Sequence, residues 1–349
     1  VNSTFSRSLT TFPAMPRYFG YAVILGAGLA TAAIIQDLSA YEYETALRNY
    51  RAVSLEAATA TGKAVESSLG QIYQNIRTIS LLPSAVKIDR HGKSLDADAR
   101  LSIQQIYNNL ASNVAVSEVY IVPVDFNPDA LDPATGKPQQ PILMFDQLIT
   151  NASRNGAQGR DAGAPARAPE VEIHEYRQLP EHLAWFRQHY PTNRGLDGLN
   201  VPFFSGAEVI TRDNTEYDAS KADTDRLGLM FSVPLYGPEG ALKGAITAVI
   251  RTNALRTLLP ERDAALVNVG NGVVADALKA GQQQLSRQWV QQGRADPSLL
   301  FSTSIPVAID DRGGQWLLWV GHAKEDFLAF VQKFTPRAMS MSPDMPSVR

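Results

Sequence analysis

The sequence predicts an α+β protein that begins with a transmembrane helix, continues into a long stalk helix and ends in two tandem antiparallel-sheet modules. Three observations predict this order: an uncharged apolar run near the N-terminus, a long proline-free segment with a regular apolar stripe, and repeated strand–turn–strand patterns. The chain has 349 residues, a formal net charge of -3 and no cysteine. It is therefore long enough for two or three domains, lacks the basic excess of nucleic-acid-binding proteins, and can form no disulfide or thiolate metal site.

The first element is an apolar run near the N-terminus. Residues 18–35 carry no charge and, as a helix, would span about 27 Å, just enough for the hydrocarbon core of a bilayer. Arg7 and Arg17 precede the run, whereas Asp37 and Glu42 follow it. By the positive-inside rule, residues 1–17 would lie in the cytoplasm. We therefore expect a single-pass inner-membrane helix at residues 18–36, with the bulk of the chain in the periplasm.

Two other interpretations of this run stay open. A cleaved signal peptide would use Ala30-Thr31-Ala32 as its small-residue cleavage site. Gly26, Gly28 and Thr31 also resemble the dinucleotide fingerprint G-x-G-x-x-G, although the third glycine is replaced and no strand ending in an acidic residue follows about 20 residues later.

The second element is a stalk helix at residues 37–82, which Pro83 ends. A helix of about 40 residues is about 60 Å long, more than one small domain can bury. We expect the lower half of its apolar stripe to pair two protomers in a homodimer and the upper half to pack on the chain's own first module. The stripe has the 3.5-residue period of a coiled-coil seam and consists of Leu55, Ala58, Gly62, Val65, Leu69, Ile72, Ile76 and Ile79.

The first sheet module is expected at residues 83–259. Its strongest signal is a hairpin over residues 227–252, in which two β-rich runs flank the turn Gly237-Pro238-Glu239-Gly240. A helix over residues 181–190 would be opened by Pro180. The other expected elements are a helix at 96–112, strands at 117–125 and 201–212, a short packed element at 142–149, a short helix after residue 252, and polar loops at 126–141 and 154–169.

The second module, residues 260–330, repeats the pattern on a smaller scale. Residues 266–274 predict a strand, a glycine turn at Gly270-Asn271-Gly272 and a strand. Residues 299–309 and 315–322 predict a hairpin around a turn that contains Asp310 and Asp311, two residues typical of turns. Residues 331–349 would form a C-terminal tail.

The runs YNNLASNVAVSEVYIVPVDFNPD (107–129) and SVPLYGPEGALKGAITAVI (232–250), behind a transmembrane run and a long helix, resemble double Cache domains. These are PAS-like periplasmic sensor domains of bacterial receptors of the diguanylate cyclase, phosphodiesterase, histidine kinase and chemoreceptor types. The resemblance covers about residues 18–330. It implies that the membrane-distal module, residues 83–259, binds a small molecule and that helix displacement transmits the signal. No second transmembrane run or output domain follows, so a truncated receptor and a stand-alone anchored sensor both stay open.

The ligand in a PAS-like sheet lies against the concave face, so candidate ligand-binding residues are sought on or beside the predicted strands. An arginine can clamp a carboxylate through two hydrogen bonds, and aromatic side chains can wall the site. The tyrosine–arginine–tryptophan–tyrosine–aspartate pattern of amino-acid-binding members does not fit the spacing here, which argues against amino-acid sensing. The candidates are Tyr120, Asp125, Trp185, Phe203, Arg212 and Tyr236.

Motifs of enzymes are missing from the sequence: it has no H-E-x-x-H, no G-x-S-x-G and no P-loop. His182 and His189 are seven residues apart, which favours a solvated helix over a metal pair. We therefore expect no enzyme, metal or cofactor, and a small-molecule ligand of unknown class. The alternative is an anchored periplasmic interaction module that binds a protein partner through the polar insert at residues 126–169.

Overall fold

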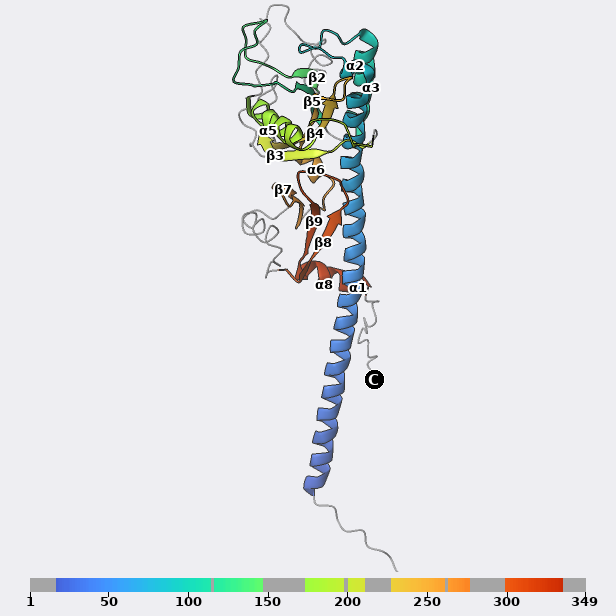
Figure 1. Ribbon diagram of the computed structural model, residues 1–349. Coiled ribbons are helices and arrows are strands. Elements are labelled where there is room, and N and C mark those ends of the chain that lie inside the picture. Colours follow the sequence, from blue (N-terminus) through green and yellow to red (C-terminus); the bar gives the residue numbers. More distant parts are fainter. Residues whose placement is uncertain are drawn as a thin grey trace, which may run out of the picture. The chain divides into compact units, whose positions relative to one another are not determined.

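The computed structural model describes residues 17–113, 116–146, 173–197, 200–210, 227–260, 263–276 and 299–334 (Figure 1). It divides into two compact units, residues 1–54 with 327–349 and residues 55–326. The described part confirms the predicted α+β class, with a long N-terminal helix and two antiparallel sheets.

The N-terminal helix α1, Arg17–Leu81, is continuous, so the expected transmembrane and stalk segments form one element. Its apolar beginning is long and hydrophobic enough to cross a bilayer. Ile24, Leu25 and Leu29 are 66–72% exposed, as side chains that face lipid would be. The dinucleotide interpretation is wrong, because Gly26 and Gly28 lie inside this helix and not in a strand-to-helix turn.

The C-terminal helix α8, Lys324–Phe334, contributes its aromatic residues to the first compact unit. Phe327 packs edge-on against Tyr43 of α1 at 5.4 Å between ring centroids, and Phe330 lies 5.2 Å from Tyr50. The helix continues beyond residue 330, where the second module was expected to end. Residues 335–349 of the expected tail lie outside the described residues.

The first sheet has the strand order β2-β1-β5-β4-β3, and all neighbouring strands are antiparallel. The predicted hairpin is confirmed as β4 and β5, with Gly240 in the left-handed region at φ 77° and the Gly237 N–H donating to the Ala241 carbonyl at 2.9 Å. The short helix α6, Thr252–Arg256, follows it. The strands are β1 Val116–Pro123, β2 Ile142–Asp146, β3 Phe204–Ile210, β4 Leu227–Tyr236 and β5 Leu242–Arg251.

Besides α1 and α6, the described helices that pack against the first sheet are α2 Pro83–Val86, α3 Ala97–Asn113 and α5 Ile173–His189. The prediction that Pro180 opens α5 is wrong, because the helix begins two turns earlier and contains this proline. A proline inside a helix loses one N–H donor and crowds the carbonyl four residues earlier, but the buried side chains of Tyr176 and Leu179 in the preceding turn anchor that turn to the sheet. Tertiary packing therefore outweighs the local signal.

The first sheet is buried on both faces. One face carries Val119, Ile121 and Phe231 and shares an apolar core with α1, and α5 covers the opposite face (Figure 1). The α1 stripe enters this core from Ala58 onward, and its members from Val65 to Ile79 are 0% exposed. The upper members, Leu69 to Ile79, therefore pack on their own chain as expected, whereas Ala58 and Val65 of the lower half do so as well, which corrects the expectation that this half pairs two protomers.

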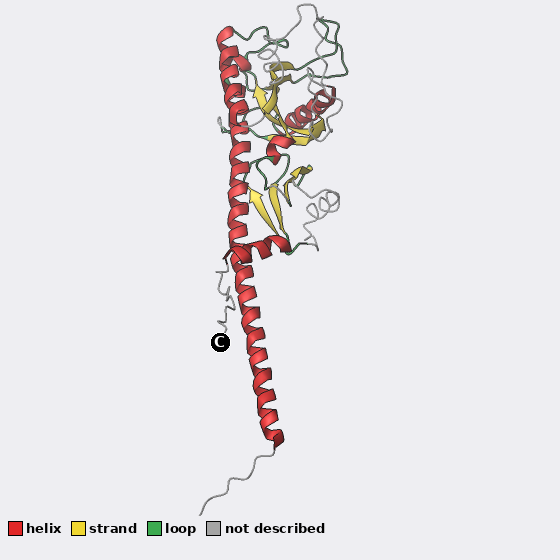
Figure 2. Ribbon diagram, turned by 180° about the vertical axis from the view of Figure 1, so that it is seen from behind, coloured by secondary structure: helices red, strands yellow, loops and turns green. Residues whose placement is uncertain are grey.

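The second sheet has the order β7-β6-β9-β8 and forms a separate group of strands in Figure 2. Trp316 and Leu318 bring its inner face into the same apolar core. A Cβ atom on Gly62 would lie 3.3 Å from Ile305, so this glycine allows α1 to approach the sheet closely. The strands are β6 Ala264–Asn268, β7 Gly272–Asp276, β8 Phe301–Val307 and β9 Trp316–His322, which confirms the two predicted strand pairs.

Candidate functional site

The face of the first sheet that α5 covers contains an unusual number of buried polar side chains. Strand alternation turns Val119 and Ile121 toward α1 and turns Tyr120 toward α5. On this face, polar groups replace several of the apolar residues that a helix-covered sheet normally presents. We call these residues the polar layer: Glu118 and Tyr120 of β1, Ser232 of β4, Thr247 of β5, and Glu175 and His182 of α5.

One half of the polar layer is built around the Tyr120 hydroxyl, which donates a hydrogen bond to Glu175 Oε2 at 2.8 Å and also contacts the Glu118 carboxylate. Both carboxyl groups are buried. The Tyr176 ring packs edge-on against Tyr120 and against Phe126, at 5.9 and 6.1 Å between centroids. Burying carboxyl groups is unfavourable unless polar partners compensate, so their presence under a helix is a typical mark of a functional site.

The other half is a hydrogen-bond chain that starts at His182. The His182 Nδ1 lies 2.7 Å from Ser232 Oγ, which in turn lies 2.7 Å from Thr247 Oγ1. The Nε2 atom has no hydrogen-bond partner among the described residues, and it lies so close to Gly206 that a Cβ there would approach it to 2.2 Å. A buried N–H without an acceptor is unfavourable, so the proton sits on Nδ1 and is donated to Ser232.

Burial lowers the pKa of His182 to about 3, so this histidine is neutral in the folded chain. The prediction of a solvated helix face is therefore wrong for His182, although His189 is exposed. Among the described residues, no three His, Asp or Glu side chains gather closely enough to hold a metal ion.

The depressed pKa of His182 makes stability depend on pH. Below about pH 6.5 the unfolded chain binds a proton at this histidine and the folded chain does not, until the pH approaches 3. We expect the unfolding free energy to fall by about 2 kcal/mol from pH 7 to pH 5 through this residue. A His182→Asn variant, which keeps a donor for Ser232 but cannot titrate, should lose that part of the decline in denaturant titrations, whereas His189→Asn should keep it. Equal pH dependence in both variants would contradict the assignment.

The six predicted binding residues do not come together in one place. Tyr120 belongs to the polar layer, and Trp185 lies beside it on α5, stacked on Phe204 at 4.5 Å. Phe203 faces the other side and stacks on Phe231 at 5.1 Å in the α1-facing core.

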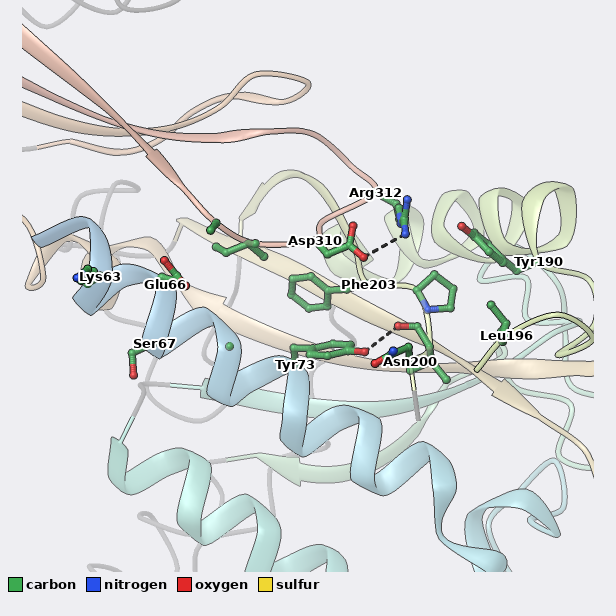
Figure 3. A pocket seen from close by; sticks show the side chains of 15 residues that line it. Lys63, Glu66, Ser67, Tyr73, Tyr190, Leu196, Asn200, Phe203, Asp310 and Arg312 are labelled. Carbon is green, nitrogen blue, oxygen red and sulfur yellow. Dashed lines mark hydrogen bonds and ion pairs between the residues drawn. The ribbon is translucent and has the colours of Figure 1, made fainter. Parts of the chain in front are cut away.

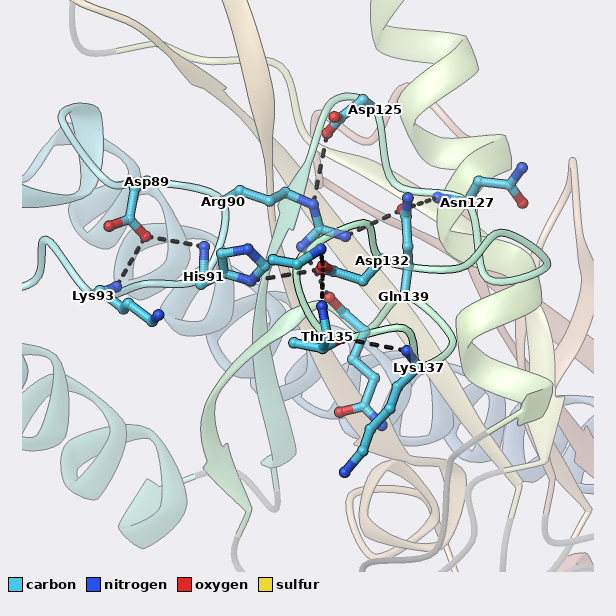
Figure 4. Close-up of polar contacts among 12 residues, drawn as sticks. Asp89, Arg90, His91, Lys93, Asp125, Asn127, Asp132, Thr135, Lys137 and Gln139 are labelled. Carbon is cyan, nitrogen blue, oxygen red and sulfur yellow. Dashed lines mark hydrogen bonds and ion pairs between the residues drawn. The ribbon is translucent and has the colours of Figure 1, made fainter.

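The remaining three lie elsewhere. The Tyr236 hydroxyl donates to the Tyr190 carbonyl at 3.2 Å, and burial raises its pKa. Asp125 is 73% exposed and faces Arg90 at 3.9 Å, while Arg90 also donates to Gln139 (Figure 4). Arg212 lies outside the described residues. Whether any of the six contacts a ligand stays a prediction.

Glu118, Glu175, His182 and Ser232 were not among the sequence candidates. One signal could have indicated Glu118, because it is the one charged residue of the β-rich run VSEVYIVP and lies two positions from Tyr120. No local signal distinguishes Glu175 or His182 from the exposed polar residues of an amphipathic helix.

A second polar centre joins the two sheets. The β8–β9 turn, residues 308–315, places the Asp311 carboxylate where it accepts hydrogen bonds from the Ser205 N–H at 2.9 Å and the Trp316 Nε1–H at 2.7 Å. Asn268 of β6 and the Gly313 N–H also donate to it, at 3.2 and 2.8 Å. Burial raises the pKa of Asp311, and these hydrogen bonds oppose that effect. Asp311 is therefore a turn residue, as predicted, and also the connection between β3 and the second sheet.

No family model and no curated protein sequence matches this chain. Solved structures do match. The ligand-binding domain of the Pseudomonas aeruginosa PAO1 amino acid chemoreceptor PctC, in complex with GABA, is 13% identical; the match covers 76% of this chain and 98% of that chain, with a TM-score of 0.40.

Two further solved structures match over a similar share of the chain. The periplasmic sensory domain of the Campylobacter jejuni chemoreceptor Tlp1 is 12% identical, with 77% of this chain and 93% of that chain covered and a TM-score of 0.42. A domain of a putative sensory box/GGDEF family protein from Vibrio parahaemolyticus is 12% identical. That match covers 78% of this chain and 97% of that chain, with a TM-score of 0.42. At these scores the matches assign no ligand and no site, so we argue the function from this chain's own side chains.

Proposed function

We propose that this chain is the extracytoplasmic ligand-sensing portion of a membrane-anchored bacterial receptor. In this proposal the module at residues 83–259 is membrane-distal and binds a polar small molecule at the α5 face of the first sheet. The observation that carries the proposal is the polar layer, which places two carboxyl groups and a neutral histidine between α5 and the sheet. Soluble ligands are recognised by a few well-placed polar groups among aromatic walls, and Tyr176, Phe126 and Trp185 supply such walls.

The same sheet suits the transmission of a signal. Each strand presents side chains to both faces of the sheet. Tyr120 on the α5 side and Ile121 on the α1 side are therefore neighbours in β1. A ligand that binds one arrangement of the α5 face better than another shifts the population of that arrangement. Because interdigitated cores do not deform continuously, the opposite face and the α1 stripe would move with it.

The same proposal includes a homodimer that pairs through α1, but through a surface other than the apolar stripe. The stripe from Ala58 to Ile79 is occupied by the chain's own sheets. Pairing of two copies would instead use exposed residues nearer the N-terminus of α1, such as Leu38 and Tyr41, which are 57% and 66% exposed.

A thermal-shift screen of the full chain in lipid nanodiscs tests ligand binding. The panel would contain organic acids, amino acids, amines and nucleobases. A ligand that binds only the folded chain at 100 times its Kd stabilises it by about 2.7 kcal/mol, which raises the Tm by several degrees. We expect a hit whose shift is lost in Glu175→Gln and Tyr120→Phe and retained in Gln188→Ala, which alters an exposed residue of α5. Hits with full shifts in both polar-layer variants would contradict the proposed site.

A further inference from the structure

A cavity of about 810 Å³ lies away from the polar layer, and three segments distant in sequence form its wall (Figure 3). Residues 63–73 of α1 line one side, Leu196 and residues 200–203 before β3 line another, and residues of the β8–β9 turn line a third. A volume of this size is typical of sites for small organic molecules. All three segments belong to the compact unit at residues 55–326.

The floor of the cavity is aromatic and fixed in place. Tyr73 and Phe203 pack edge-to-face with 5.4 Å between their centroids, and both appear at the centre of Figure 3. The Tyr73 hydroxyl donates to the Val201 carbonyl at 2.9 Å, so this ring cannot swing away without losing a hydrogen bond. Rigid aromatic rings favour a ligand that is itself flat and aromatic, because offset stacking and edge contacts add to the burial of apolar surface.

Charges of both signs flank this floor. Lys63 and Glu66 of α1 lie to one side of the aromatic pair, and Asp310 and Arg312 of the β8–β9 turn lie over Phe203 (Figure 3). The Arg312 Nη2 and Asp310 Oδ2 atoms are 3.0 Å apart, with 47% and 83% of their side chains exposed. An exposed ion pair of this kind contributes little to stability, which leaves both groups able to exchange partners with a ligand.

We infer that this cavity is a second small-molecule site, separate from the polar layer, which binds a planar aromatic molecule that carries both a cationic and an anionic group. The ring would lie on Tyr73, whose position Phe203 fixes by its edge contact, and the charged groups would meet Lys63 or Glu66 on α1 and Asp310 or Arg312 on the β8–β9 turn. The inference does not depend on a ligand at the α5 face.

A ligand in this cavity would also affect how the β8–β9 turn is held against the first sheet. The β8–β9 turn is attached to the first sheet through Asp311 and through the Arg312 N–H, which donates to the Phe203 carbonyl at 2.7 Å. A ligand that touches α1 and this turn together would stabilise the arrangement in which both sheets are joined.

The absence of cysteine from the chain allows a site-directed test. Ser67→Cys places a single thiol on the cavity wall, and Ala60→Cys places one at an exposed α1 position outside the cavity. Each full-length variant in nanodiscs is equilibrated under mild reductant with disulfide-linked fragments of three kinds: an aromatic zwitterion, an uncharged aromatic ring and an aliphatic zwitterion. Intact-mass spectrometry measures how much of each fragment is captured.

We expect the aromatic zwitterion to be captured at least tenfold more completely by Ser67→Cys than by Ala60→Cys, and more completely than the other two fragments. Adding Arg312→Gln, a change at an exposed side chain that should not disturb folding, is expected to reduce capture several-fold. Equal capture at both positions, or capture that does not distinguish the three fragments, would overturn the inference. Undiminished capture in the Arg312→Gln background would overturn the assignment of a charged group of the ligand to the β8–β9 turn.

Discussion

An Asp311→Ala substitution is expected to lower the unfolding free energy by about 3 kcal/mol, because it leaves several donors without an acceptor. The N–H groups of Ser205 and Gly313, the Trp316 indole and the Asn268 amide all converge on this one carboxylate. They come from β3, from the turn itself and from two strands of the second sheet. Removing Asp311 should therefore weaken the junction of the two sheets, and not only the local turn.

Asp310→Ala is the matched control for this substitution. Asp310 is the preceding residue of the same turn, but it is 83% exposed and its ion pair is with Arg312, two residues away. A surface pair of this kind is worth about 0–1 kcal/mol. Chemical denaturation of both variants measures the difference. Equal and small losses in the two variants would show that Asp311 does not join the sheets.

Ile76→Ala on α1 is expected to lower the unfolding free energy by about 3 kcal/mol, and the loss should not depend on protein concentration. Ile76 is fully buried in the core that α1 shares with the first sheet. Truncating a buried isoleucine to alanine removes apolar burial and leaves a cavity, which together destabilise by about 2–5 kcal/mol. Because the surface against which Ile76 packs belongs to the same chain, dilution cannot separate Ile76 from that surface.

The control for Ile76→Ala is Leu55→Ala, at a stripe position that is 48% exposed, where the change should stay within about 0.5 kcal/mol. Denaturation over a hundredfold range of protein concentration distinguishes the two models of the stripe. If the midpoint of Ile76→Ala falls with dilution more steeply than that of the unaltered chain, the stripe pairs protomers as a coiled-coil seam does.

Much of the fold could be predicted because its signals are local. Gly237 and Gly240 between two β-rich runs specify the β4–β5 hairpin, and the nearly continuous β-rich run VSEVYIVP is typical of a strand buried on both sides. The α1 stripe could be found from its period. The covering of its upper half by the chain's own first module was also predicted, but that of its lower half was not, since an apolar face of this spacing fits a partner helix as well as the chain's own sheet.

The site was predicted less well, for a physical reason. Strand alternation separates Tyr120 from Ile121, but it does not say which of the two meets α5. Glu175 reaches Tyr120 across 55 positions of sequence, and His182 reaches Ser232 across 50. These contacts depend on how α5 docks on the sheet. The sequence prediction started this helix after Pro180, so it missed the first two turns, which contain Glu175.

The central claim is that ligand binding at the α5 face of the first sheet is passed to α1. Hydrogen–deuterium exchange of the full chain in nanodiscs, with and without a saturating hit from the thermal-shift screen, tests it most directly. The expected result is a change of exchange in β1 and α5 together with a change in residues 65–79 of α1, whose side chains pack on the opposite face. Protection confined to β1 and α5, with exchange in α1 unaltered, would contradict the claim.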